Sequence, residues 1–405
     1  MDTATVAARL EEAREADQRA RSLICDEVSA AFLAAGTVPS FDVRTADPVD
    51  DPHFLCADRY WRRRFQDRPT ARTAVACARW MSDHVRKGSW GEVAERWALG
   101  NGFLDRTDTE SDERTAEAMG EAATGPGGER VAYFVALYHA GKLRANFRFD
   151  DLYAFLTHSP SAGAVGSLRA EPAYVALQAF AAFGSRALTV AHACGLLERS
   201  WSAPDRTRQT LDICLHGIAF AAPFEGQGEL LRRHAEEAVR AWPDDHVFHA
   251  RLAAGHHLCG RHDAALESID TALSLLATGP TADLTGLQDQ YLTRRESIQE
   301  GRLRALRDAD QQRRWSEQTA ANARLERTLH TSSTRTVEVV AIFTAAIAFA
   351  IGSLQITLTG ELPLSDRLWL LTAQGAGLAT FALLIVGGTW LITRNQDHGG
   401  DEEER

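Results

Sequence analysis

The chain has 405 residues, of which 45% are hydrophobic and 24% charged, and this balance predicts a folded protein of two or three units. Its formal net charge of -11 argues against nucleic acid as a partner, because nucleic-acid binders carry a basic balance or a basic face. The six cysteines form no CxxC pair, so they indicate neither a disulfide framework nor a zinc knuckle.

Two further features concern the source and compartment of the protein. Only Lys87 and Lys142 are lysine among the 44 basic residues, and with the abundant alanine this is typical of a GC-rich bacterial genome. The N-terminal segment MDTATVAARLEEAREAD lacks the apolar core of a signal peptide. The bulk of the chain is therefore expected on the cytoplasmic side of any membrane.

The N-terminal part, residues 1–128, is predicted to be a helical domain. A first helix is expected from Asp2 to Ala35, where Gly36 stops it. The segment ATGPGG, residues 123–128, combines Gly and Pro with a change in charge density, so it predicts a domain edge. It is not a phosphate-binding loop, because the Lys and the Ser or Thr that such a loop needs do not follow it.

Residues 129–281 are predicted to form a helical-repeat domain. Ile218 and Ala219 match Leu252 and Ala253 at a spacing of 34 residues. The segment RLAAGHHLCGRHDAALESIDTAL, residues 251–273, resembles a tetratricopeptide repeat, a family with a helix-turn-helix period of this length.

The resemblance implies a superhelix whose first helices line a groove that binds a protein or peptide ligand. Where a typical repeat has an aromatic residue on its first helix, this chain has His249 and His256. Carried onto this sequence, the resemblance places the following residues in the groove: His216, Phe220, Val247, Ala250, Ala254 and His257.

No catalytic or cofactor motif stands out. Five histidines cluster between His246 and His262, but no carboxylate or cysteine has a complementary spacing, so a metal site is not favoured. No nucleophile elbow, HExxH motif or paired-carboxylate arrangement occurs. The sequence therefore predicts neither an enzyme nor a cofactor.

Residues 282–335 are predicted to form a polar stalk helix or a weak coiled coil. Leu284, Leu287, Tyr291 and Ile298 have a heptad-like spacing, and charges of both signs fill the remaining positions. Such a stalk could also dimerise the chain.

Residues 336–393 are predicted to be two transmembrane helices. Val337 to Leu358 contains Glu338 as its only charge, and Leu368 to Thr393 contains none. At about 1.5 Å per residue, each segment is long enough for a hydrocarbon core of about 30 Å. Trp369 and Trp390 stand near the ends of the second segment, as in an interfacial belt. A soluble hairpin is the alternative, but it would show a polar stripe, and neither segment has one.

Basic residues set the expected orientation of this hairpin. Arg324, Arg327 and Arg335 precede the first span and Arg394 follows the second, while the connector offers only Arg367. Both termini are therefore expected on the cytoplasmic face of the bacterial inner membrane. The remaining tail, residues 394–405, is acidic and expected to be disordered.

Small residues four positions apart within the spans predict close helix packing. This packing could join the two helices of one chain or two protomers of a homo-oligomer, and the sequence leaves both open. The residues are Ala341, Ala345, Ala348, Gly352, Ala373 and Gly377.

Two hypotheses for the whole chain follow. In the first, an all-α repeat domain anchored at the membrane binds a protein or peptide partner. In the second, capture of a ligand rearranges the hairpin and makes the bilayer leak. The second layout resembles that of two-span effectors in bacterial conflict and antiphage systems, by architecture alone.

Overall fold

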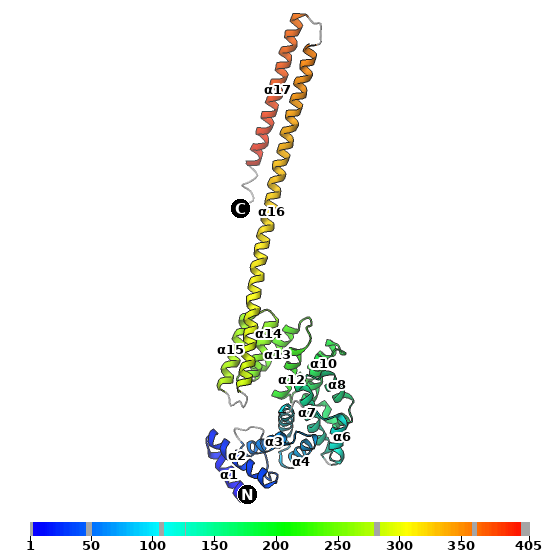
Figure 1. The fold of residues 1–405 in the computed structure, drawn as a ribbon, viewed down its shortest axis with the longest axis vertical. Coiled ribbons are helices and arrows are strands. Elements are labelled where there is room, and N and C mark those ends of the chain that lie inside the picture. Colours follow the sequence, from blue (N-terminus) through cyan, green and yellow to red (C-terminus); the bar gives the residue numbers. More distant parts are fainter. Residues whose placement is uncertain are drawn as a thin grey trace. The chain divides into compact units, whose positions relative to one another are not determined.

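The computed structural model describes residues 3–45, 51–104, 109–125, 127–278, 284–358 and 363–397 (Figure 1). These residues form helices joined by short connections, and the isolated bridge between Val43 and Val85 is the sole pairing of extended backbone among them. The expected all-α class is confirmed for this part of the chain. The chain divides into two compact units, Met1–Ala305 and Leu306–Arg405.

Several helices of the first unit begin at residues whose side chains cap the helix. Asp17 accepts a hydrogen bond from the amide of Ala20 at 2.8 Å, and Gly36, with a φ of 64°, ends the same helix. The helices before the ATGPGG segment are α1 (Thr3–Glu15), α2 (Gln18–Ala35), α3 (Pro52–Asp67), α4 (Ala71–His84), α5 (Trp90–Leu104), α6 (Asp112–Met119) and the 3-10 helix η1 (Gly120–Ala123). Those after it are α7 (Gly128–Ala145), α8 (Phe149–His158), α9 (Pro160–Ala164), the 3-10 helix η2 (Gly166–Ala170), α10 (Pro172–Gly184), α11 (Val190–Trp201), α12 (Arg208–Phe220), α13 (Gln227–Ala241), α14 (His246–Leu258) and α15 (His262–Thr278).

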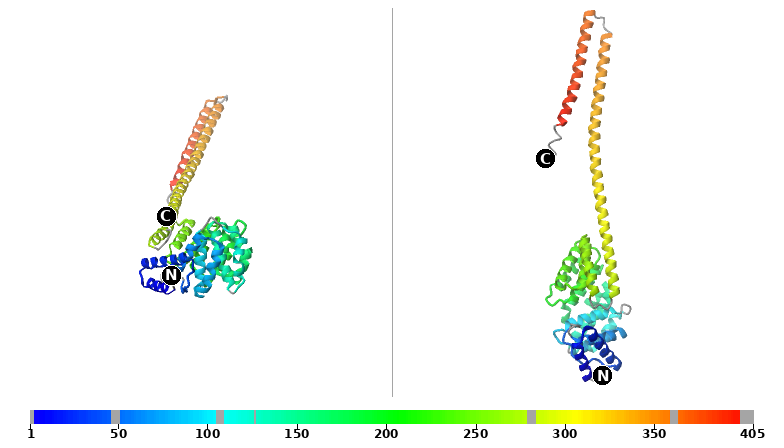
Figure 2. Two further views of the ribbon diagram at one scale, coloured as in Figure 1. Left: turned by 60° about the horizontal axis from the view of Figure 1, so that its bottom comes forward. Right: turned by 90° about the vertical axis from the view of Figure 1, so that its left-hand side faces the viewer.

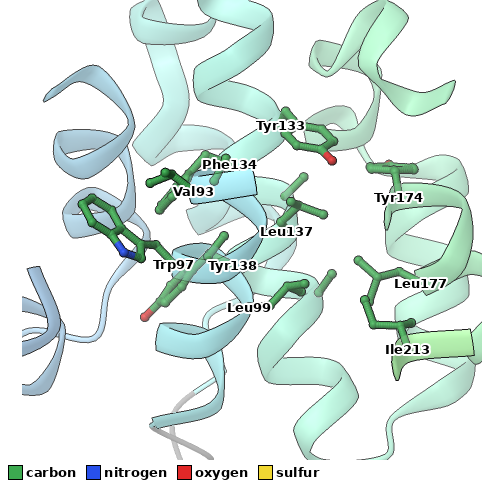
Figure 3. Packing of buried hydrophobic residues seen from close by; sticks show 14 of the residues in the cluster. Val93, Trp97, Leu99, Tyr133, Phe134, Leu137, Tyr138, Tyr174, Leu177 and Ile213 are labelled. Atoms are coloured by element: carbon green, nitrogen blue, oxygen red, sulfur yellow. The ribbon is translucent and has the colours of Figure 1, made fainter. Parts of the chain in front are cut away.

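Helix α7 lies at the centre of the main core. It is buried at every position from Val131 to Leu143, as expected for a helix surrounded on all sides. Figure 3 shows its side chains between those of α5 and those of α10 and α12. The contacting residues include Val93, Trp97, Leu99, Tyr133, Phe134, Leu137, Tyr138, Tyr174, Leu177 and Ile213.

Helices α5 and α7 approach each other through glycine. A Cβ atom on Gly102 would lie 2.6 Å from the carbonyl oxygen of Tyr138, and one on Gly141 would lie 3.4 Å from the Cα atom of Leu99. A side chain at Gly102 would therefore overlap the backbone of α7, whereas a Cβ atom at Gly141 would make an ordinary contact with α5.

Core packing is continuous across the ATGPGG segment, because α5 on one side packs against α7 on the other. Gly127 in this segment has a φ of 79°, which favours glycine, and a Cβ atom on Gly128 would lie 2.1 Å from the carbonyl oxygen of Ala123. Packing alone does not test whether the two parts fold independently, so the domain edge at residue 128 stays a prediction.

The last helices of the first unit pack in chain order, α12 against α13, α13 against α14 and α14 against α15 (Figure 1). The long helix α16 (Leu284–Leu358) begins in this unit. Its side chains Tyr291 and Ile298 join Ala265 and Ile269 of α15 and Ala253 of α14 in a second apolar cluster. Successive helix pairs fit a repeat domain, and the tetratricopeptide superhelix itself stays a prediction.

The second unit contains the rest of α16 and helix α17 (Leu364–Asp397), which run side by side (Figure 2). A Cβ atom on Gly377 would lie 3.8 Å from the ring of Phe349, whereas one on Gly352 or Gly375 would meet nothing within 4 Å, so the predicted small-residue packing stays a prediction. Within the described residues, no helix is both long enough and apolar enough to cross a membrane.

Parts of the second unit fall outside this description. Residues 359–362 and 398–405, and many side chains of the two predicted spans, lie outside the described residues. The transmembrane hairpin therefore stays a prediction, as does the disorder of the tail, of which residues 394–397 belong to α17.

Candidate functional site

One face of α12 gathers side chains of mixed chemistry. Arg208, Asp212, His216 and Phe220 are spaced four apart, so they lie along the same side of the helix. Each is half-buried or exposed, whereas Leu211, Leu215 and Ile218 on the other side are buried in the core. Thr207 starts the helix in a capping box with Thr210.

Asp212 is held between two arginines from different helices. Its carboxylate lies 3.2 Å from the Nη2 atom of Arg144, at the end of α7, and 3.3 Å from that of Arg251 on α14. The three side chains are only 15–17% exposed. Burial by itself would raise the pKa of Asp212, but Arg251 and Arg144 outweigh it and lower the pKa. The carboxylate is therefore ionised at neutral pH.

His216 is an uncharged member of this face. Arg144 donates a hydrogen bond from Nη2 to the Nδ1 atom of His216 at 2.9 Å, which places the imidazole proton on Nε2. Burial, followed by the charges of Arg251 and Arg144, lowers the pKa of His216 to about 2. His216 therefore accepts a hydrogen bond here without adding charge.

Arg294, near the start of α16, adds a third guanidinium group, whose charge interacts with that of Arg251 and acts on His216. It is half-buried and has no hydrogen bond or ion pair with any residue in the described ranges. Burial, followed by the neighbouring charge of Arg251, lowers its pKa. Arg144, Asp212, Arg251 and Arg294 are called the arginine cluster below.

The adjacent Arg208 shows what a fully paired guanidinium looks like in this protein. It donates to both carboxylate oxygens of Asp245, at 2.5 and 3.1 Å. Asp245 also caps α14 by accepting the amide proton of Val247 at 2.9 Å. Arg208 therefore carries no surplus charge into the arginine cluster.

Two exposed aromatic rings lie beside the cluster. Phe147 and Phe220 stack with their ring centroids 5.1 Å apart, and the ring of His216 lies 4.7 Å from that of Phe220. Phe147 is 43% and Phe220 45% exposed. Phe147 has a φ of 54°, a left-handed conformation that is uncommon for a bulky residue. Such strain gathers at functional sites. These two residues are called the Phe pair.

The residues predicted to line the groove have different environments. His216 and Phe220 lie together beside the arginine cluster. Val247 is half-buried on α14, while Ala250 and Ala254 are buried at 8% and 4% exposure. The Nδ1 atom of His257 lies 3.3 Å from that of His262. The role of these residues in partner binding stays a prediction.

The residues predicted to pack the membrane helices all belong to α16 and α17. Gly377 faces Phe349 of the neighbouring helix, whereas Ala345, Ala348 and Ala373 are exposed within the single chain. Among the described residues, no atom lies within 4 Å of a Cβ atom placed on Gly352. The side chain of Ala341 lies outside the described residues. Whether these positions pack within one chain or between protomers stays open.

The histidines between residues 246 and 262 have separate partners. His246 bonds to the Tyr291 hydroxyl at 2.8 Å through Nδ1, and His249 to the carbonyl oxygen of Pro243 at 2.8 Å. Over the ranges that the structure describes, no three His, Cys, Asp or Glu side chains gather in an arrangement that could hold a metal ion.

Sequence reasoning missed the three arginines of the cluster. Arg144, Arg251 and Arg294 are far apart in the chain and come from three helices, so no local motif joins them. One signal was present in the sequence: charged and aromatic residues repeat every four positions from Arg208 to Phe220. A pattern of this kind indicates a helix face that is not fully buried in the hydrophobic core.

Comparisons with models of protein families, with curated proteins and with solved structures found no match. The fold and the site therefore define only a class: an all-helical protein with an arginine cluster and an exposed Phe pair on one face of its first unit.

Proposed function

We propose that this chain is a membrane-anchored helical-repeat protein that binds a protein or peptide partner at the cytoplasmic face of a bacterial membrane. The apolar segments between residues 336 and 393 support the anchor, and the successive helix pairs from α12 to α15 support the repeat domain.

One observation carries the proposal. Large apolar side chains are exposed on the second unit, among them Phe343 at 65%, Ile347 at 58%, Ile351 at 61% and Trp369 at 77%. Apolar surface in water costs about 25 cal/mol per Å², and contiguous exposed patches mark an interaction with a membrane or a partner. A lipid bilayer would remove this surface from water on all sides of the two helices.

The Phe pair supports the partner-binding half of the proposal. Exposed aromatic rings are common anchors of protein interfaces, because they bury a large area at a low cost in side-chain entropy. Charged and hydrogen-bonding groups lie directly beside the rings. The face therefore combines an apolar contact with groups that can select a ligand.

Membrane extraction tests the anchor. The full-length chain is expected to stay in the membrane fraction after alkaline washing. Changing both Phe343 and Ile347 to Arg should release it, because each arginine at the centre of a span costs about 2.5–3.5 kcal/mol. Leu303 and Leu306 lie on the same helix with similar exposure, 51% and 59%, so arginine at both of these positions is the matched control.

Retention of the Phe343→Arg, Ile347→Arg chain in the membrane, or release of the Leu303→Arg, Leu306→Arg control, would contradict the anchor. The same cells should exclude a membrane-impermeant dye. Dye entry would favour the leak-forming alternative over a purely anchoring hairpin.

Photo-crosslinking tests the partner-binding face. A benzophenone side chain in place of Phe220 is expected to produce a crosslinked species larger than the chain in cells. The control is the same side chain in place of Phe103 on α5, which is 51% exposed. Equal crosslinking from both positions would contradict a specific face.

A further inference from the structure

The arginine cluster holds more positive charge than its surroundings offset. Arg144, Arg251 and Arg294 supply three guanidinium groups, and Asp212 supplies the one carboxylate paired with them. His216 adds no charge, and Arg208 is matched by Asp245. Within the described residues, the cluster therefore has a surplus of two positive charges. A half-buried charge without a partner is unfavourable, so a bound anion would stabilise the cluster.

Hydrogen-bond donors in the cluster are unmet as well. The Nε–H groups of Arg144 and Arg251 are buried and lack an acceptor among the described residues. Arg294 donates to no described residue. A buried donor that is left unpaired costs the full desolvation of the group. A bound oxyanion would bring several acceptor oxygens to guanidinium groups that now share a single carboxylate.

The size of the surplus selects the kind of anion. A carboxylate would neutralise one charge, whereas a phosphomonoester carries about -1.5 to -2 near neutral pH. Arginine also matches the spacing of phosphate oxygens, because its planar group donates two parallel hydrogen bonds. The charge of the cluster therefore fits a phosphate better than a carboxylate.

We propose that the arginine cluster binds the phosphate of a phosphomonoester and that the Phe pair contacts the flat apolar group that carries it. His216 connects the two parts, since it accepts a hydrogen bond from Arg144 and packs against Phe220. The aromatic rings provide a stacking surface beside the phosphate.

This inference rests on the partner-binding face of the proposed function and names the chemistry that this face recognises. Its test measures phosphate binding by the purified full-length chain in detergent. Membrane extraction measures the anchor separately, so each can fail without the other.

The experiment is a calorimetric titration at constant ionic strength and at about pH 7.5, where the phosphate is mostly dianionic. Phenyl phosphate is expected to bind most tightly, inorganic phosphate more weakly and benzoate weakest. Inorganic phosphate binding as tightly as phenyl phosphate would indicate free phosphate as the ligand and overturn the role of the Phe pair. The phosphate assignment would be overturned if benzoate bound as tightly as phenyl phosphate. It would also be overturned if neither phenyl phosphate nor inorganic phosphate bound.

Two substitutions distinguish specific binding at the arginine cluster from a general effect of positive charge. Arg294→Gln should weaken phenyl phosphate binding at least about tenfold, because one charge-assisted contact is lost. Arg294 is in no ion pair with a described residue, so its loss leaves the pairs at Asp212 intact. Arg295→Gln is the matched control, since Arg295 pairs with Asp270 at 2.6 Å, and it should bind like the unaltered chain. Equal losses in both variants would overturn the proposal.

Phe220→Ala completes the test. It should weaken the binding of phenyl phosphate and leave that of inorganic phosphate unchanged. Unaltered binding of phenyl phosphate by this variant would overturn the role assigned to the Phe pair.

Discussion

Single residues in this protein show how burial and partners set protonation. Asp212 and Glu95 are both carboxyl groups in poorly exposed positions, but only Asp212 is paired with arginines. Glu95, on α5, accepts a hydrogen bond from the hydroxyl of Thr207 at 2.5 Å and is 4% exposed. Burial raises the pKa of Glu95 to about 7, although the Thr207 hydrogen bond opposes this effect. Glu95 is therefore a group that the fold prefers to keep protonated.

Replacing Glu95 with Gln should stabilise the protein at alkaline pH. Because the pKa of Glu95 is higher in the folded chain than its ordinary value of 4.5, its contribution to stability is complete below pH 4.5 and is lost as the pH rises through about 7. At about pH 8 the Glu95→Gln chain should be more stable by up to about 3 kcal/mol, and at about pH 4 the two should match. Denaturant unfolding at both pH values measures the difference.

Glu117→Gln is the control, because Glu117 is an exposed glutamate on α6 and is not among the charges that act on Glu95. It should leave the stability unchanged at both pH values. A Glu95→Gln chain that gains no stability between the two pH values would show that Glu95 is ionised without penalty.

At the scale of helices, the close approach of α5 and α7 depends on the absence of side chains. Gly102 and Gly141 face each other across this contact, where Tyr138 supplies a backbone carbonyl. Neither backbone can retreat easily, since α7 is surrounded by other helices along its length.

Gly102→Ala should destabilise the protein by about 1–3 kcal/mol, because a new methyl group would overlap the carbonyl of Tyr138. Gly100 lies on the same helix, and a Cβ atom there would meet nothing within 4 Å. Gly100→Ala should therefore stabilise the protein by up to about 1 kcal/mol, through helix propensity alone. Thermal unfolding of the two variants, followed by circular dichroism, compares them. Equal effects would mean that the contact can relax.

At the scale of the whole molecule, the apolar packing described here is contained in the first unit. Both apolar clusters lie between Val6 and Ile298, and the second depends on the start of α16. Tyr291 is 7% and Ile298 0% exposed, so this part of α16 belongs to the core.

A chain that ends after Ala305 should fold cooperatively and unfold at the same temperature as the first unit of the full-length chain. A chain that ends after Thr278 loses Tyr291 and Ile298. It should be less stable by about 3–6 kcal/mol, at about 1.5–3 kcal/mol for each buried side chain. Its Tm should fall by roughly 5–10 °C. Circular dichroism melts of both chains measure this, and matching melts would show that the first unit ends before α16.

The sequence by itself determined that the described residues are helical, because caps, glycine stops and apolar periodicity act between residues that are close along the chain. The single helix expected from Asp2 to Ala35 was wrong in one respect: the structure has two helices, α1 and α2, because Asp17 caps the start of α2. The transmembrane hairpin is likewise inferred from local composition and still awaits its test.

Only the tertiary structure decided which side chains meet. His216 and Phe220 were predicted to line one groove, and the structure places them together beside the arginine cluster. The cluster itself joins side chains from α7, α12, α14 and α16, and its surplus charge is visible only when all four helices are in place. Ion pairs and burial depend on distances in space, and the spacing of residues along one chain does not contain them.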